Sequence, residues 1–286
     1  MKTLLAVDGS DNANEAVRTL QYFSIDHLVV LHALDVPKPA YPMMVPEVAA
    51  ELYQELEQSM RGDAERLLDR TVSLLPPHTG PVTKMIRVGS PAEVILTAAE
   101  EEHIELIVMG ARGLGPIKER VFGSVSHRIL TAAPCAKLIV SRPVKRMQKV
   151  LLPLRSASDT DDALRFLRLK PFRQPVELSL LSVLPRVQPS WGTAALAAEP
   201  LQARELENAQ LFLKSTVNQL ERMGYSARWH VLVGTPIESI VEQAQRQGVD
   251  LILMGSRGRQ GVLRLMLGSV SHAVLHSAPC PVLVFS

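Results

Sequence analysis

Residues 107–141 read IVMGARGLGPIKERVFGSVSHRILTAAPCAKLIVS, and residues 252–286 read ILMGSRGRQGVLRLMLGSVSHAVLHSAPCPVLVFS. Aligned without a gap, 16 of these 35 positions are identical, at a constant offset of 145 residues. Upstream, residues 88–91 (VGSP) match residues 233–236 (VGTP) at the same offset. A repeat of this length and fidelity indicates that one structural unit occurs twice in the chain.

The repeat extends to the beginning of each copy. Residues 15–17 (EAV) match residues 162–164 (DAL) at an offset of 147. Each copy is therefore about 140 residues long, which is the size of a domain rather than of a solenoid repeat. The sequence predicts a tandem duplication, with domain 1 at residues 1–143 and domain 2 at residues 147–286.

Composition bounds the class of protein. The chain has 286 residues, of which 47% are hydrophobic, so it can build full cores, and disordered or disulfide-stapled scaffolds are excluded. The formal charge of +2 gives no chain-wide argument for nucleic acid or membrane binding. It averages two unlike halves: split at residue 143, the first half has 14 basic and 18 acidic residues (−4), and the second has 17 and 11 (+6).

Location follows from the cysteines and the apolar runs. The chain has only Cys135 and Cys280, far apart, and no apolar stretch of 18 residues. We therefore expect a soluble cytoplasmic protein without a membrane span.

Strand and helix patterns alternate along both copies. Continuous apolar runs, typical of strands buried on both faces, occur at 3–7, 27–34, 82–88, 105–109 and 136–141, and again at 149–154, 176–183, 228–233, 250–254 and 281–285. In the first copy, helical patterns lie between them near 11–22, 46–75, 91–103 and 124–132. This alternation predicts an α/β fold: two tandem doubly wound domains, each a parallel sheet with helices on both faces.

A glycine-rich segment follows the fourth strand of each copy. The first copy has Gly110 and Gly113, then nine residues, then Gly123-Ser124; the second repeats the spacing with Gly255, Gly258 and Gly268-Ser269. Glycines allow tight turns, and a helix start presents unpaired N–H groups that suit phosphate oxygens. The alternative is a plain turn followed by a serine that caps its helix. No Walker-type or dinucleotide glycine motif is present.

With these residues the chain resembles the universal stress protein family in its tandem two-domain form. The resemblance rests on G-x-x-G-x9-G-S, the helix after it and the Ala-Pro-Cys segments at 133–135 and 278–280. It implies two universal stress protein domains, each with a five-stranded parallel sheet of the Rossmann-like, adenine nucleotide alpha hydrolase-like type. It also implies the ATP-binding subclass, with ATP (or ADP or AMP), with or without Mg²⁺, as cofactor.

The resemblance assigns roles residue by residue. Asp8 would approach the ribose and adenine, Ala33 would offer backbone groups to the adenine edge, and Met109 would line the base pocket. Gly110, Arg112 and Gly113 would form the ribose and phosphate turn, and Gly123, Ser124, Val125 and Ser126 would hold the phosphates by amides and hydroxyls. The corresponding cofactor-binding residues of domain 2 are Val183, Met254, Gly255, Arg257, Gly258, Gly268, Ser269, Val270 and Ser271.

Domain 2 departs from the family pattern at the end of its first strand. The alignment puts Arg155 opposite Asp8 and Pro153 opposite Ala6, so a long cation replaces a short carboxylate where base and sugar are expected. Either Arg155 turns outward and the site survives, or it blocks or alters nucleotide binding.

The leading functional hypothesis is an ATP-binding stress-response switch or scaffold. The alternatives are a slow ATPase or other nucleotide-dependent enzyme, and a nucleotide-free module that binds a small molecule or a protein. No catalytic residue and no metal ligand is assigned. The expected partners are an adenine nucleotide and regulatory proteins, without nucleic acid. The resemblance implies that the last strands of the two copies pair in an internal pseudo-dimer, and a homodimer of two chains is a further hypothesis.

Overall fold

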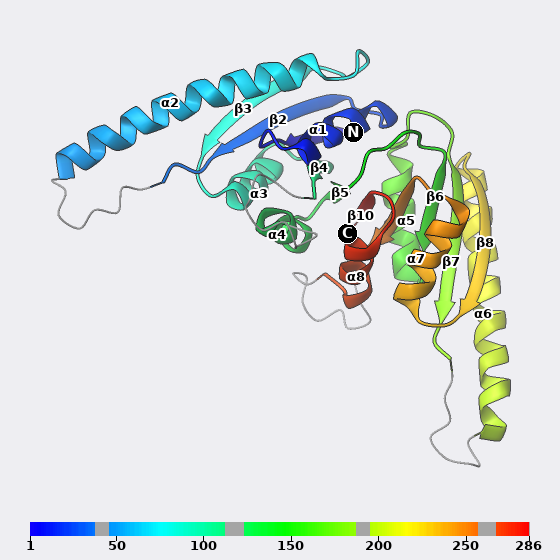
Figure 1. Cartoon of the computed structure of the whole chain (residues 1–286). Helices are drawn as coiled ribbons and strands as arrows, with labels where there is room; N and C mark the ends of the chain where they lie inside the picture. The colour runs from blue at the N-terminus through cyan, green and yellow to red at the C-terminus, as the bar shows by residue number, and fades with distance from the viewer. Residues whose placement is uncertain (38–45, 112–122, 187–194, 257–266, 286) are drawn as a thin grey trace. The chain divides into compact units, whose positions relative to one another are not determined.

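The computed structural model describes residues 1–37, 46–111, 123–186, 195–256 and 267–285. The chain divides into two compact units, Met1–Pro143 (unit 1) and Val144–Ser286 (unit 2) (Figure 1). Each unit alternates strands and helices, as the repeat in the sequence predicts.

Unit 1 is built on five parallel strands in the order β3-β2-β1-β4-β5. Its elements along the chain are β1 (Lys2–Ala6), α1 (Asp11–Thr19), a 3-10 turn η1 (Leu20–Tyr22), β2 (His27–Leu34), α2 (Pro46–Ser73), β3 (Val82–Val88), α3 (Pro91–Glu101), β4 (Leu106–Gly110), α4 (Ser124–Ala132) and β5 (Ala136–Val140).

Unit 2 repeats this architecture, with parallel strands in the order β8-β7-β6-β9-β10. Its elements are β6 (Lys149–Pro153), α5 (Ala157–Arg168), β7 (Glu177–Leu184), α6 (Ala195–Arg222), β8 (Ser226–Val233), α7 (Pro236–Gln247), β9 (Leu251–Gly255), α8 (Ser269–Ser277) and β10 (Val282–Phe285). The prediction of two tandem doubly wound α/β domains is confirmed.

Helices cover both faces of each sheet. In unit 1, α1 packs on β4 and β5 and α2 on β2 and β3, while α3 and α4 pack together on the opposite face. Unit 2 follows the same plan, with α5 and α6 on one face and α7 and α8 on the other. The central strands lie between these layers, so residues such as Leu4, Leu5 and Val108 are completely buried. Their continuous apolar runs are the pattern expected of strands covered twice.

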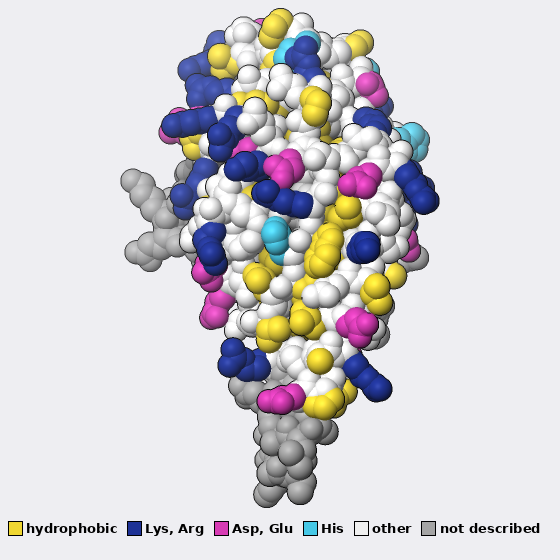
Figure 2. Space-filling model, turned by 90° about the vertical axis from the view of Figure 1, so that its right-hand side faces the viewer, with side chains coloured by type: hydrophobic (Ala, Val, Ile, Leu, Met, Phe, Trp, Pro, Cys, Tyr) yellow, Lys and Arg dark blue, Asp and Glu magenta, His cyan; other side chains and the backbone are white. Residues whose placement is uncertain are grey.

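The two outer strands differ from the prediction. The runs at 82–88 and 228–233 were expected to be buried on both faces, but β3 and β8 are exposed or half-buried along their length. Val82, Val88 and Val233 are exposed. Both strands end their sheets, so each lacks one neighbour. Figure 2 shows the side of the molecule on which β8 lies in Figure 1, where hydrophobic, basic and acidic side chains are intermixed.

Local sequence signals set the helix ends. The hydroxyl of Ser10 accepts a hydrogen bond from the Ala13 amide (3.2 Å) at the start of α1, and Ser156 caps α5 in the same way. The helices α3 and α7 begin with a proline at their first turn, where no N–H is needed. The residue after α7, Gly248, has φ of 56°, a left-handed conformation that glycine adopts without strain.

Candidate functional site

The strand order places a candidate site at the carboxyl edge between β1 and β4 in unit 1. Strand order reverses there, and ligands of open α/β sheets bind at such a point. The register puts Ala6 level with Leu31 of β2 and with Met109 of β4. Asp8 and Ala33 each lie two residues beyond this level, and Gly110 one residue beyond it. The fold thus brings three separate sequence predictions to one edge of the sheet.

Gly110 permits close packing of α1 on the end of β4. A Cβ atom at this position would lie 2.7 Å from the backbone carbonyl carbon and from Cβ of Asn12, and 2.9 Å from the Ala13 nitrogen. Real Cβ contacts essentially never come this close, so only glycine fits. This glycine has a packing role whether or not a ligand is present.

Ser126 holds the turn that follows β4. Its side chain is 3% exposed, and its hydroxyl lies within donating distance of the carbonyl oxygens of Gly110 (3.1 Å) and Ala111 (3.2 Å). The Gly123 amide also donates to the Ala111 carbonyl (3.1 Å). The hydroxyl of Ser126 is thus bonded to the backbone. The backbone amide of Ser126 lies in the first turn of α4, where it can donate to a ligand.

The first turn of α4 presents unpaired amides. Its N-cap is Gly123, which has no side chain to accept a hydrogen bond, and the first intrahelical bond runs from the His127 amide to the Gly123 carbonyl (3.0 Å). The amides of Ser124, Val125 and Ser126 therefore have no acceptor among the described residues. Three such amides and the helix dipole favour an anion at this position.

The first turn of α8 in unit 2 is built in the same way. Gly268 is its N-cap without a side-chain bond, and the His272 amide donates to the Gly268 carbonyl (2.9 Å). The Ser271 hydroxyl donates to the Gly255 carbonyl (2.8 Å), as Ser126 does to Gly110. Both copies thus keep the same turn and the same helix start.

At the exit of β1, the carboxylate of Asp8 accepts a hydrogen bond from the Ser10 amide (3.0 Å) and is half-buried. The neighbouring Val7 carbonyl lies 2.7 Å from Nδ1 of His32, which therefore carries the proton and donates. These bonds fix the chain where it leaves the sheet, with one oxygen of Asp8 bonded to the backbone and the other without a partner among the described residues.

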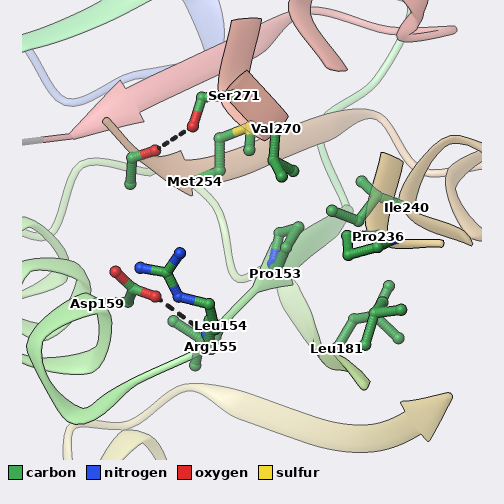
Figure 3. A pocket seen from close by; sticks show the side chains of 12 residues that line it. Pro153, Leu154, Arg155, Asp159, Leu181, Pro236, Ile240, Met254, Val270 and Ser271 are labelled. Carbon is green, nitrogen blue, oxygen red and sulfur yellow. Dashed lines mark hydrogen bonds between the residues drawn. The ribbon is translucent and has the colours of Figure 1, made fainter. Parts of the chain in front are cut away.

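Unit 2 contains a pocket of about 100 Å³ at the corresponding edge (Figure 3). Strands β6, β7 and β9 and helices α5, α7 and α8 contribute to it, and apolar side chains form most of its wall. Its lining residues are Pro153, Leu154, Arg155, Asp159, Leu181, Val183, Pro236, Ile240, Met254, Gly255, Val270 and Ser271.

Comparison of the two copies divides this lining into two groups. Seven residues are identical to their unit 1 counterparts: Leu181, Pro236, Ile240, Met254, Gly255, Val270 and Ser271 correspond to Leu31, Pro91, Ile95, Met109, Gly110, Val125 and Ser126. Five differ: Pro153, Leu154, Arg155, Asp159 and Val183 stand where unit 1 has Ala6, Val7, Asp8, Asn12 and Ala33. All five lie on β6, its exit, the first turn of α5 and the end of β7.

The site residues predicted for domain 2 fall into three sets. Five of them line the pocket, namely Val183, Met254, Gly255, Val270 and Ser271. Gly268 and Ser269 begin α8 next to it, as Gly123 and Ser124 begin α4. Arg257 and Gly258 lie outside the described residues, as do Arg112 and Gly113 of domain 1.

Sequence reasoning missed several residues of the pocket wall, among them Leu181, Pro236 and Ile240. The sequence contains a signal for Pro236, because this residue belongs to the Val-Gly-Thr-Pro segment that repeats Val-Gly-Ser-Pro. Ile240 follows one turn later on the same helix. Leu181 becomes visible only through the pairing of β7 with β6.

In the described part of the chain, no group of three or more His, Cys, Asp or Glu side chains is arranged to hold a metal ion. Over the same residues, none of the helices combines the length and the apolar character that crossing a membrane requires.

Known proteins show the same organisation. The sequence pattern of the universal stress protein family matches residues 1–141 and again residues 147–286. A universal stress protein of Mycolicibacterium smegmatis is 26% identical, with 98% of this chain and 95% of that protein aligned. The "Universal stress protein in QAH/OAS sulfhydrylase 3'region" of Thermus aquaticus is 36% identical over 140 residues, 48% of this chain and 96% of the relative.

Solved structures agree on the fold. The crystal structure of a universal stress protein from Archaeoglobus fulgidus aligns with a TM-score of 0.63 at 22% identity, covering 99% of this chain and 95% of that one. The match of the family pattern to both halves shows that the chain belongs to the universal stress protein family, with two of its domains in tandem.

Proposed function

We propose that unit 1 binds an adenine nucleotide at the carboxyl edge of its sheet and that nucleotide occupancy acts as a switch, or as a signal to a scaffold, in a stress response. The observation that carries the proposal is the first turn of α4. Three amides without an acceptor among the described residues lie there beside a turn that Ser126 holds in place. Such a helix start is suited to the phosphate oxygens of a nucleotide.

The nucleoside would lie next to the exits of β1 and β2. The free oxygen of Asp8 would accept a hydrogen bond from a ribose hydroxyl, and the apolar side chain of Met109 would contact the base. Because Asp8, Ala33 and Gly110 lie one or two residues beyond a common level of three adjacent strands, a single extended ligand can reach all of them. Mg²⁺ would come coordinated by the phosphates, since it retains waters and needs few protein ligands.

Isothermal titration of the full chain with ATP tests the binding step, and Asp8→Asn tests the role of the carboxylate. We expect a roughly tenfold or greater loss of affinity, because a hydrogen bond to a charged group contributes about 1.5–3 kcal/mol. Asp11→Asn is the matched control: it removes the same charge from the exposed first turn of α1, three residues away. Absence of ATP binding, or an equal effect of the two substitutions, contradicts the proposal.

Hydrogen exchange with and without ATP tests the switch. The amides of Ser124, Val125 and Ser126 should become protected on binding, and so should segments outside the site. Protection confined to the site would mean a nucleotide carrier rather than a switch. Steady hydrolysis of ATP by the wild-type chain would instead favour the slow ATPase.

A further inference from the structure

The pocket of unit 2 retains the unit 1 residue at seven of its lining positions and replaces it at five. Gly255, Val270 and Ser271 keep the turn and the helix start that suit an anion. Four of the substitutions lie on β6, its exit and the end of β7, where a nucleoside would lie in unit 1, and the fifth, Asp159, lies beside Gly255. Substitutions concentrated at the nucleoside end indicate a change in that part of the ligand.

The first structural change is in the strands. In unit 1, β1 pairs with β4 up to Ala6 and Met109, whereas in unit 2 the pairing of β6 with β9 ends at Leu151 and Ile252. Pro153 lacks the N–H that its counterpart Ala6 has. Strand β6 still pairs with β7 as far as Pro153, so only its pairing with β9 ends early. The pocket is lined by residues of both strands beyond the point where their pairing ends.

The second change is in the packing of the helix. A Cβ atom on Gly255 would first meet the Phe285 ring at 3.4 Å and then Oδ1 of Asp159 at 3.7 Å. No backbone atom of α5 comes as near, in contrast to the contact of Gly110 with the backbone of α1. Phe285 stands where unit 1 has Val140, and its larger side chain is buried.

The third change is in size. The pocket of unit 2 has a volume of about 100 Å³, less than the roughly 150 Å³ of a cavity in another protein that holds benzene, so its walls favour a compact ligand over the two fused rings of a purine. Val183 contributes to this, because it is larger than its counterpart Ala33 and its side chain lines the pocket. A compact carbon skeleton matches this space better than adenosine does.

The fourth change is in charge. Arg155 brings a guanidinium to the wall of the pocket, and among the described residues no ion pair engages it. The Asp159 carboxylate accepts a hydrogen bond from the backbone amide of Arg155 (3.1 Å), which fixes the chain from which the side chain extends. The surplus of six positive charges in unit 2 adds a favourable field for anions.

We propose that the pocket of unit 2 binds a compact organic phosphate that carries a second anionic group, in place of a nucleotide. The phosphate lies at the start of α8, the short carbon skeleton lies on the apolar wall, and the guanidinium of Arg155 binds the second anion. This inference rests on the proposed function in one respect, that this kind of helix start binds phosphate.

Titration of the full chain with two related probes tests it. 3-Phosphoglycerate carries a phosphate and a carboxylate on three carbons, and glycerol 3-phosphate has the same skeleton without the carboxylate. We expect the wild-type chain to bind 3-phosphoglycerate about tenfold to a hundredfold more tightly than glycerol 3-phosphate. Arg155→Gln should abolish this preference. Arg168→Gln, which removes the same charge from an exposed position at the end of α5, should retain it.

The results separate this inference from the nucleotide proposal for unit 1. Equal binding of the probes, no binding, or an unchanged preference in Arg155→Gln overturns the inference. Binding of two ATP molecules per chain overturns it as well, because the second would occupy unit 2. If the probes behave as expected and ATP does not bind, the inference stands and the function proposed for unit 1 fails.

Discussion

Gly110 at the end of β4 lies against the backbone of Asn12 in α1, so that a Cβ atom added to it would come within 2.7 Å of the Asn12 carbonyl carbon. The same two positions in unit 2, Gly255 and Asp159, are farther apart, and the nearest atom to an added Cβ is a ring carbon of Phe285 at 3.4 Å. Two glycines that the sequence presents as equivalent are thus held by different neighbours. The difference can be measured.

We expect Gly110→Ala to destabilise unit 1 by about 2 kcal/mol or more, because the new methyl group must displace backbone. Gly255→Ala should lower the stability of unit 2 by less than about 1 kcal/mol, since the Phe285 ring can shift slightly. Urea unfolding measures both. Both tryptophans, Trp191 and Trp229, belong to unit 2, so their fluorescence follows unit 2 while circular dichroism follows both units. Equal losses in the two variants would contradict the packing argument.

Ser126→Ala should destabilise unit 1 by about 1 kcal/mol, because its buried hydroxyl no longer bonds to the turn after β4. The turn positions the helix start, so the affinity for ATP should fall as well. Ser124→Ala is the control for stability: its exposed side chain makes no bond of this kind among the described residues, and the free energy of unfolding should change by less than about 0.5 kcal/mol. Thermal unfolding and ATP titration give the two readings. A larger stability loss in Ser124→Ala would reverse the roles assigned here.

Ser10→Ala should lower the stability of unit 1 by about 1 kcal/mol, because the Ala13 amide at the start of α1 loses its acceptor. Ser10→Asp should retain most of the stability, since a carboxylate also caps a helix. The midpoint of urea unfolding followed by circular dichroism measures both. If Ser10→Asp is as unstable as Ser10→Ala, the cap is not what Ser10 contributes.

The raised pKa of Tyr225 predicts how the stability of unit 2 changes at alkaline pH. Its hydroxyl donates to the Leu167 carbonyl (2.7 Å), and burial raises the pKa of Tyr225 to about 12 from a usual 10. The folded unit thus keeps a proton between pH 10 and 12 that the unfolded chain loses, and stability falls as the pH rises through this window. Tyr225→Phe should remove this part of the decline.

The measurement is urea unfolding followed by tryptophan fluorescence at several pH values from 9 to 12. Tyr53→Phe, in α2 of unit 1, is the control and should leave the decline in unit 2 unchanged. Parallel curves for wild type and Tyr225→Phe would contradict the assignment.

The sequence predicts most of the fold because two signals coincide. Apolar runs mark the strands, and the repeat shows that whatever is found in one copy should recur in the other. The glycine spacing located the turn after β4 and the start of α4, and the same elements in unit 2. It did not show which glycine serves packing, because that depends on how near another backbone comes, as with Gly110 and Asn12.

The differences between the copies are harder to predict. Arg155 is visible in the alignment as a change of charge, but the early end of the pairing between β6 and β9 depends on Pro153 and its neighbours in space. The packing of the Phe285 ring against Gly255 is harder still to predict, because in the sequence Phe285 looks like an ordinary strand residue. The half-exposed β3 and β8 were mistaken for buried strands because an apolar run alone does not reveal the strand order.

Both units belong to one polypeptide, and this has a consequence for the cell. Two separate genes for the two kinds of unit would produce them in a ratio that varies with transcription, translation and degradation. A single chain makes them in equal numbers under every condition. If the two sites bind different metabolites, the ratio of their occupancies is independent of how much of the protein is present.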